Sequence, residues 1–195
     1  NGHSLWGVHT SDVANLDPEV DLVISYCYNY KIKYPFISGP KYGCINFHPA
    51  PLPEYRGLAV YNFGILNEEE EWGVTCHYVN SQFDKGEIIS ETRFYIDPNH
   101  TAQSLRDLSH KYLLKELENF LENSLDLLSR SRVPQPEGGN YYSRQMLEKE
   151  RIVNLEDPSS LIDKKIRAFF CPPYRGASII VGGKEYELCM ENINE

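Results

Sequence analysis

Short apolar runs alternate with one long amphipathic segment along this chain. Residues 21–26 and 43–48 are apolar and rich in β-branched side chains, which is typical of buried, parallel strands. Residues 73–79 predict a third strand, and residues 87–95 predict a fourth strand of mixed pattern. The second strand must end at Pro49, because proline cannot donate a hydrogen bond to a sheet ladder.

Helical periodicity is clearest in the middle of the chain. From residue 101 to about residue 128, leucine and aromatic residues recur at steps of three and four, and Thr101 can cap the helix that this spacing predicts. A shorter helix is expected over residues 59–66. Alternating strands and helices predict an open α/β sheet, in which ligands bind at the carboxyl ends of the strands.

The composition changes after Val133, where a Pro- and Gly-rich linker begins. Beyond it, residues 159–169 predict a short charged helix, and the Gly182-Gly183 pair predicts the turn of a hairpin. We therefore expect a core over residues 1–133, and a linker plus a small C-terminal helix and hairpin subdomain over residues 134–195.

Composition and charge narrow the class of protein. The chain has 195 residues, a 41% hydrophobic fraction and a formal net charge of −9, which rules out a mainly disordered chain. An acidic chain argues against nucleic acid as the main partner, and the apolar runs are too short to span a membrane. Five cysteines without a CxxC pair predict free thiols in a reducing cytoplasm and support no metal site.

Three polar residues are candidates for chemistry. Asn46 and His48 end the second strand on the same face, and Asp84 follows the third strand. An amide can stabilise an oxyanion, an imidazole can move protons, and a carboxylate can orient the imidazole. From spacing alone, however, a lone histidine at a strand end is more often structural, and Asp84 suits a turn.

No serine or cysteine stands as an obvious nucleophile beside these residues, and the chain has no glycine-rich phosphate loop. This favours direct transfer of a group onto an external nucleophile. Residues 43–57 (GCINFHPAPLPEYRG) also resemble the signature of folate-dependent formyltransferases, and residues 73–79 with 84–89 resemble its second half at the family's spacing.

The resemblance implies a Rossmann-like sheet, 10-formyltetrahydrofolate as formyl donor and an amine as acceptor. By matching position, Asn46 would hold the formyl oxygen, His48 would be the general acid and base, and Asp84 would orient His48. Two segments match positions that hold the pterin, largely through backbone groups, and they comprise Tyr30, Lys31, Ile32, Asn80, Ser81, Gln82, Phe83 and Asp84.

Within the family, residues 48–57, 140–144 and 165–177 look like the bacterial sugar N-formyltransferases. The acceptor implied is a nucleotide-linked 3- or 4-amino-deoxysugar for surface polysaccharide such as O-antigen, modified in the bacterial cytoplasm by a homodimer. Candidate sugar contacts, with packing or loop bracing as the alternative, are Tyr55, Arg56, Tyr142 and Arg144.

Other functions fit the same three residues. Formylation of methionyl-tRNA or glycinamide ribonucleotide, and hydrolysis of formyltetrahydrofolate, use such a site, and the chain could also be an inactive module that binds folate or a nucleotide sugar. The chain begins at Asn1 without a methionine, whereas family members have a βαβ portion before the strand matched at residues 21–26. We therefore expect that portion, with part of the acceptor pocket, to be missing.

Overall fold

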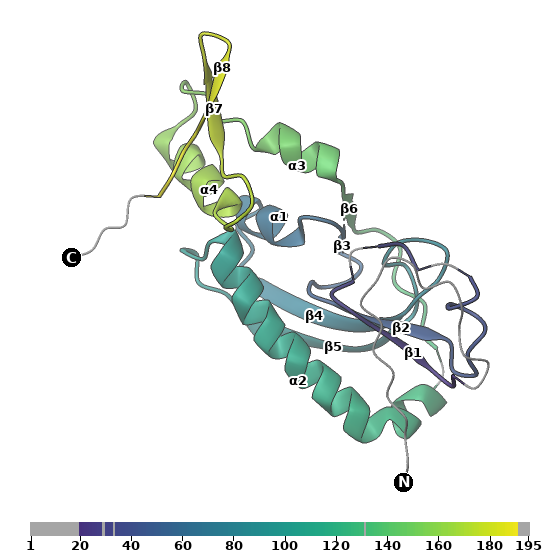
Figure 1. Cartoon of the computed structure of the whole chain (residues 1–195). Coiled ribbons are helices and arrows are strands. Elements are labelled where there is room, and N and C mark those ends of the chain that lie inside the picture. The colour runs from purple at the N-terminus through teal and green to yellow at the C-terminus, as the bar shows by residue number, and fades with distance from the viewer. Residues whose placement is uncertain (1–19, 29, 33, 131, 191–195) are drawn as a thin grey trace.

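The centre of the molecule is a four-stranded sheet with the strand order β1-β2-β4-β5 (Figure 1). The computed structural model describes residues 20–28, 30–32, 34–130 and 132–190. β1 and β2 are parallel, whereas β4 is antiparallel to both of its neighbours. All four strands were predicted, and they span Val23–Tyr26 (β1), Cys44–His48 (β2), Glu71–Tyr78 (β4) and Ile88–Tyr95 (β5). The α/β fold class is confirmed.

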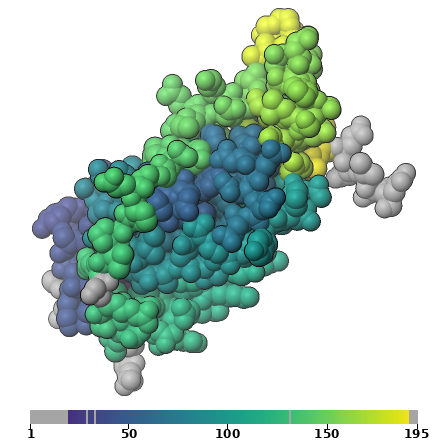
Figure 2. All heavy atoms as spheres, turned by 180° about the vertical axis from the view of Figure 1, so that it is seen from behind, coloured from purple at the N-terminus to yellow at the C-terminus, as the bar shows by residue number. Residues whose placement is uncertain are grey.

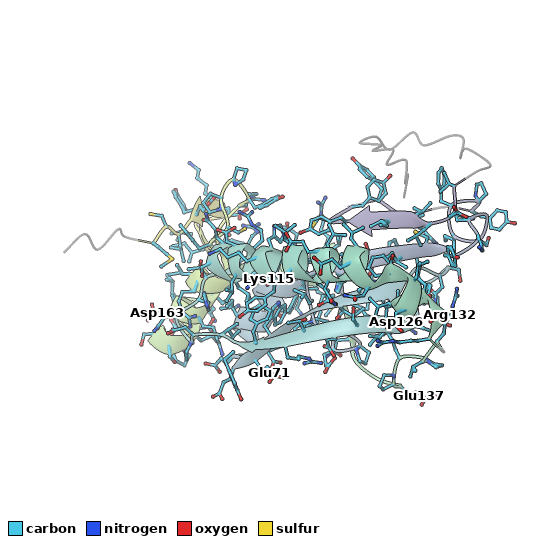
Figure 3. The ribbon with its side chains drawn as sticks, turned by 90° about the horizontal axis from the view of Figure 1, so that it is seen from below. Glu71, Lys115, Asp126, Arg132, Glu137 and Asp163 are labelled. Carbon is cyan, nitrogen blue, oxygen red and sulfur yellow. The ribbon has the colours of Figure 1, made fainter. Side chains whose placement is uncertain are left out.

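One face of the sheet is covered by the long helix α2 (Ala102–Ser129), which runs along the strands in Figure 3 with Lys115 and Asp126 on it. As predicted, Thr101 caps the helix and accepts a hydrogen bond from the Ser104 backbone N–H. The ring of Phe47 in β2 meets that of Phe120 in α2, with ring centroids 5.9 Å apart. Because side chains alternate along a strand, the residues on either side of Phe47 point to the opposite face.

That opposite face carries two short strands that the sequence did not predict, together with the short helix that was expected over residues 59–66. Strand β3 (Tyr55–Gly57) pairs in parallel with β6 (Asn140–Tyr142), and helix α1 (Val60–Leu66) follows β3. Three residues are too few to show strand periodicity, so neither β3 nor β6 was recognisable. The pairing of β6 with β3 brings the chain back to the core directly after the linker. The domain boundary expected after residue 133 stays a prediction.

The C-terminal part contains the predicted helix and hairpin. Helix α3 (Arg144–Glu150), which was not predicted, precedes helix α4 (Ser159–Phe169), and the hairpin joins β7 (Ser178–Val181) to β8 (Lys184–Glu187). The hairpin projects from one end of the molecule (Figures 1 and 2). Helix α4 is attached to the core through α1, where Asn62 Nδ2 donates to the Ala168 carbonyl at 2.7 Å.

Two predictions concern the chain as a whole. All five cysteines are free thiols, as expected. Among the described residues, no helix combines the length and apolar character needed to cross a membrane. Residues 1–19 of the predicted core lie outside the described residues. The expectation that an N-terminal portion is missing concerns the same end of the chain and stays a prediction.

Packing between α1 and β4 leads to a first prediction. A Cβ at Gly64 would lie 2.5 Å from the ring of Trp72. That ring is fully buried, and its Nε1–H donates to the Pro49 carbonyl at 3.1 Å, so it cannot turn away. Overpacking costs about 1–3 kcal/mol, whereas alanine gains about 1 kcal/mol in helix propensity. We expect Gly64→Ala to lower the free energy of unfolding, measured by urea denaturation.

Lys111→Ala, on the exposed surface of α2, is the control and should change the free energy of unfolding by less than about 0.5 kcal/mol. A Gly64→Ala protein as stable as wild type would show that Trp72 is not fixed.

Candidate active site

Three adjacent strands place polar residues in one row of the sheet. Ser25 in β1 is the cross-strand partner of Asn46 in β2, and Asn46 is the partner of His77 in β4. Ser25 Oγ lies 2.7 Å from Asn46 Oδ1, and Asn46 Nδ2 lies 3.2 Å from His77 Nε2. The predicted residue Asn46 is thus held from both sides by two residues that were not predicted as part of the site.

His48 follows two residues later on the same face of β2. Its Nε2 lies 2.7 Å from the backbone oxygen of Tyr55, and the side chain is buried. A carbonyl oxygen only accepts, so we assign the proton to His48 Nε2. The other ring nitrogen, Nδ1, lies 3.8 Å from Asp84 Oδ1. Proton transfer by this imidazole is therefore assigned to Nδ1.

The loop after β4 holds Asp84 tightly. Asp84 Oδ2 accepts a hydrogen bond from the Gly57 backbone N–H at 2.8 Å, and Gln135 Nε2 donates to the backbone oxygens of Asp84 and Gly86 at 2.8 and 2.7 Å. Gly86 is required here, because a Cβ would lie 1.6 Å from the Tyr78 oxygen. This loop places Asp84 Oδ1 between two imidazoles, facing those of His48 and His77.

His77 is neutral in this arrangement. Its Nε2 lies 3.7 Å from Asp84 Oδ1, and its Nδ1 lies 2.8 Å from the Tyr78 carbonyl oxygen. Burial lowers the pKa of His77 from 6.5 to about 4, although the Asp84 carboxylate acts to raise it. The nearby His48 also lowers this pKa. At neutral pH, His77 therefore adds no positive charge to the cluster.

The two segments predicted to hold the pterin meet beside Asp84. Lys31 Nζ lies 5.7 Å from the ring centroid of Phe83, and Phe83 lies 6.3 Å from the ring of Tyr141. Phe83 and Tyr141 are 49% and 46% exposed, so both have surface free for a ligand. Asn80 Oδ1 accepts a hydrogen bond from the Gln82 N–H at 2.8 Å, which fixes the turn of the second segment. Tyr30 and Ser81 are exposed and Ile32 is half-buried.

The four predicted sugar contacts divide into two groups. Tyr55 and Tyr142 are buried and stacked, with ring centroids 5.2 Å apart, so their rings act in packing. Arg56 is also buried, and its NH2 group donates to the carbonyls of Gly138 and Gly139, so it braces the linker. Arg144 alone of the four is exposed.

The sequence and the fold are similar to those of known proteins. A family model described as "Formyl transferase" matches residues 10–117. The chain is 32% identical over 174 residues to a GDP-perosamine N-formyltransferase from Brucella melitensis, covering 89% of this chain and 65% of that protein. It is 28% identical over 180 residues to a methionyl-tRNA formyltransferase from Moorella thermoacetica, covering 91% and 55%.

Among solved structures, the fold resembles an N-formyltransferase from Helicobacter canadensis in complex with folinic acid and dTDP-3-aminofucose. The TM-score is 0.68 and the identity 26%, and the likeness covers 82% of this chain and 58% of that one. The chain thus spans 55–65% of the length of the two relatives above.

The buried His77 leads to a prediction on stability and pH. Between its folded pKa of about 4 and its ordinary value of 6.5, the unfolded chain binds a proton that the folded chain does not. Stability must therefore fall as the pH is lowered through this range, by up to roughly 3 kcal/mol from this residue. Urea denaturation of wild type and His77→Gln at several pH values measures the difference.

Glutamine does not titrate, so the free energy of unfolding of His77→Gln should depend less steeply on pH between 4 and 6.5, the range set by His77. Curves of equal slope for the two proteins would contradict a neutral, buried His77.

Proposed function

Because the chain belongs to the formyl transferase family, we propose that it transfers the formyl group of 10-formyltetrahydrofolate to the amine of a nucleotide-linked amino sugar. The observation that carries this proposal is the meeting of Asn46, His48 and Asp84 on one face of the sheet. An oxyanion donor, a proton carrier and a carboxylate are the groups that acyl transfer to an external amine requires.

The formyl donor would bind beside Asp84, between residues 30–32 and 80–84. Exposed loop backbone can hydrogen-bond the pterin edges, the ring of Phe83 offers an apolar face, and Lys31 offers a cation to a carboxylate tail. These groups fit a flat, hydrogen-bonding heterocycle with an acidic tail. When bound, the donor supplies an activated formyl carbon.

The chain's own groups then have separate tasks. Asn46 donates an N–H to the formyl oxygen as negative charge develops there. His48 takes the proton of the attacking amine at Nδ1 and returns it to the nitrogen that leaves as tetrahydrofolate. Its Nε2–H stays on the Tyr55 carbonyl throughout, which keeps the ring in place. Asp84, whose Oδ1 lies 3.8 Å from Nδ1, orients the imidazole.

Three observations support a sugar acceptor. The GDP-perosamine N-formyltransferase is 32% identical, and the similar Helicobacter structure was solved with an amino-sugar nucleotide. A net charge of −9 is unfavourable for binding the phosphates of a tRNA, whereas a nucleotide sugar can be bound by a few cationic side chains. We include in this proposal a bacterial, cytoplasmic homodimer that acts in surface-polysaccharide synthesis, with no membrane or nucleic-acid partner.

A panel of acceptors separates the alternatives. The protein is incubated with 10-formyltetrahydrofolate and amino-sugar nucleotides, glycinamide ribonucleotide or methionyl-tRNA, and the mass of each acceptor is measured. A formyl adduct on an amino-sugar nucleotide alone is expected. Formate release without any acceptor would favour a hydrolase, and binding without turnover would favour an inactive module.

Replacing His48 tests the proton-transfer assignment. We expect His48→Ala to lower kcat by about 10²–10⁴-fold, the usual contribution of general acid–base catalysis. His100→Ala is the matched control, because His100 lies two residues before α2, away from the candidate site, and contacts Ser104. Formyl transfer at the wild-type rate by His48→Ala would remove His48 from the mechanism.

The pH dependence of the reaction gives a second test. The acceptor amine attacks only as the free base, and the imidazole must be able to take up its proton. We therefore expect kcat/KM to rise from pH 5 to pH 8, measured by product mass at low acceptor concentration. A flat profile over this range would count against a histidine-mediated route.

A further inference from the structure

The row formed by Ser25, Asn46 and His77 has a defined hydrogen-bond direction. The Tyr78 carbonyl can only accept, so the Nδ1 of His77, 2.8 Å away, carries a proton. Burial keeps the imidazole neutral by lowering the pKa of His77 to about 4, so its Nε2 carries none. The atom of Asn46 that faces Nε2 must therefore be the donor Nδ2 and not the acceptor Oδ1.

The opposite side of the amide meets a hydroxyl. Asn46 Oδ1 lies 2.7 Å from Ser25 Oγ, and a hydroxyl can donate to it. The contact with His77 assigns the orientation of the amide, because a flipped amide would face the acceptor Nε2 with its own acceptor oxygen. The Ser25 hydroxyl, which can donate or accept, is compatible with this orientation and donates to Oδ1. The three residues come from adjacent strands and are cross-strand partners, so the sheet itself maintains their spacing.

Nδ2 has two hydrogens, and His77 uses only one of them. The second is left for a ligand on the face of the sheet where His48 and Asp84 lie. We propose that Ser25 and His77 are positioning residues that lock the Asn46 amide so that its second N–H points at the formyl oxygen of the donor. This inference rests on the proposed function and extends it to two residues that touch neither donor nor acceptor.

Positioning has a measurable signature that differs from substrate binding. An oxyanion donor acts mainly in the transition state, and removing one costs about 10²–10³ in kcat. An amide held only from the His77 side keeps part of this effect, so we expect Ser25→Ala to lower kcat by about 10-fold or more. The KM values for the formyl donor and for the acceptor should change by less than about threefold, because neither binds to Ser25.

Two conservative pairs separate hydrogen bonding from packing. Ser25→Thr retains the hydroxyl and should restore kcat to within about threefold of wild type, unlike Ser25→Ala. At the other end of the row, His77→Gln retains an acceptor for Asn46, whereas His77→Phe fills the space without one. We expect Gln to retain more kcat than Phe. Ser109→Ala is the control, because Ser109 is fully buried in α2 and its hydroxyl donates to the Leu105 carbonyl within the same helix.

Equal kcat for Ser25→Ala and Ser25→Thr, or for His77→Gln and His77→Phe, would overturn the proposal. So would a loss seen wholly in KM. The thermal unfolding midpoint of each variant is measured alongside, so that kcat is compared only among folded proteins.

A spectroscopic measurement tests the row without any turnover. The ¹⁵N chemical shifts of the His77 ring in the wild-type protein at pH 7 should show a protonated Nδ1 and an unprotonated Nε2. The opposite tautomer would overturn the orientation assigned to Asn46. If wild type formylates no acceptor but shows this tautomer, the proposed function fails while the hydrogen-bond row stands, so the two failures are distinguishable.

Discussion

The pairing of β3 with β6 is the constraint on which the candidate site depends. The backbone of β3 contacts two side chains of the candidate site, because the Tyr55 carbonyl accepts from His48 and the Gly57 N–H donates to Asp84. Gly57 has φ +91°, and a Cβ there would lie 2.6 Å from the Tyr142 oxygen in β6, so only glycine permits this approach. Two strands of three residues thus fix the distance between imidazole and carboxylate.

The aromatic residues behind β3 make that constraint rigid. The ring of Tyr55 lies between those of Trp72 and Tyr142, with centroids 4.7 and 5.2 Å away, and its hydroxyl donates to Glu69. Burial raises the pKa of Tyr55, in keeping with this enclosed position. The ring of Tyr55 therefore packs behind β3 and holds in place the backbone oxygen that contacts His48. The sugar contact expected of Tyr55 stays a prediction.

The elements that the sequence predicted well carry a local signal. This signal is either a long run of clear periodicity or a residue type that caps, turns or ends an element. Helix α2, its Thr101 cap, the Gly182-Gly183 turn and the stop at Pro49 each follow from local chemistry. Cross-strand pairing is different, since it joins residues far apart in the chain and leaves no local signal. Asn46, His48 and Asp84 could be proposed because they lie in a family motif. Ser25 and Gln135 lie outside that motif, and their contacts with Asn46 and Asp84 exist only in the folded chain.

His77 shows why motif and geometry give different information. It lies within the run 73–79 that carries the second half of the family resemblance, yet only the β2–β4 register reveals its contact with Asn46. Keeping this imidazole buried and neutral costs stability at acid pH, whereas an apolar side chain would avoid that cost. The cost is understandable if His77 serves as the acceptor that holds the amide. A carboxylate at the same position would add a charge beside Asp84, so a neutral imidazole is the suitable acceptor between an amide and a carboxylate.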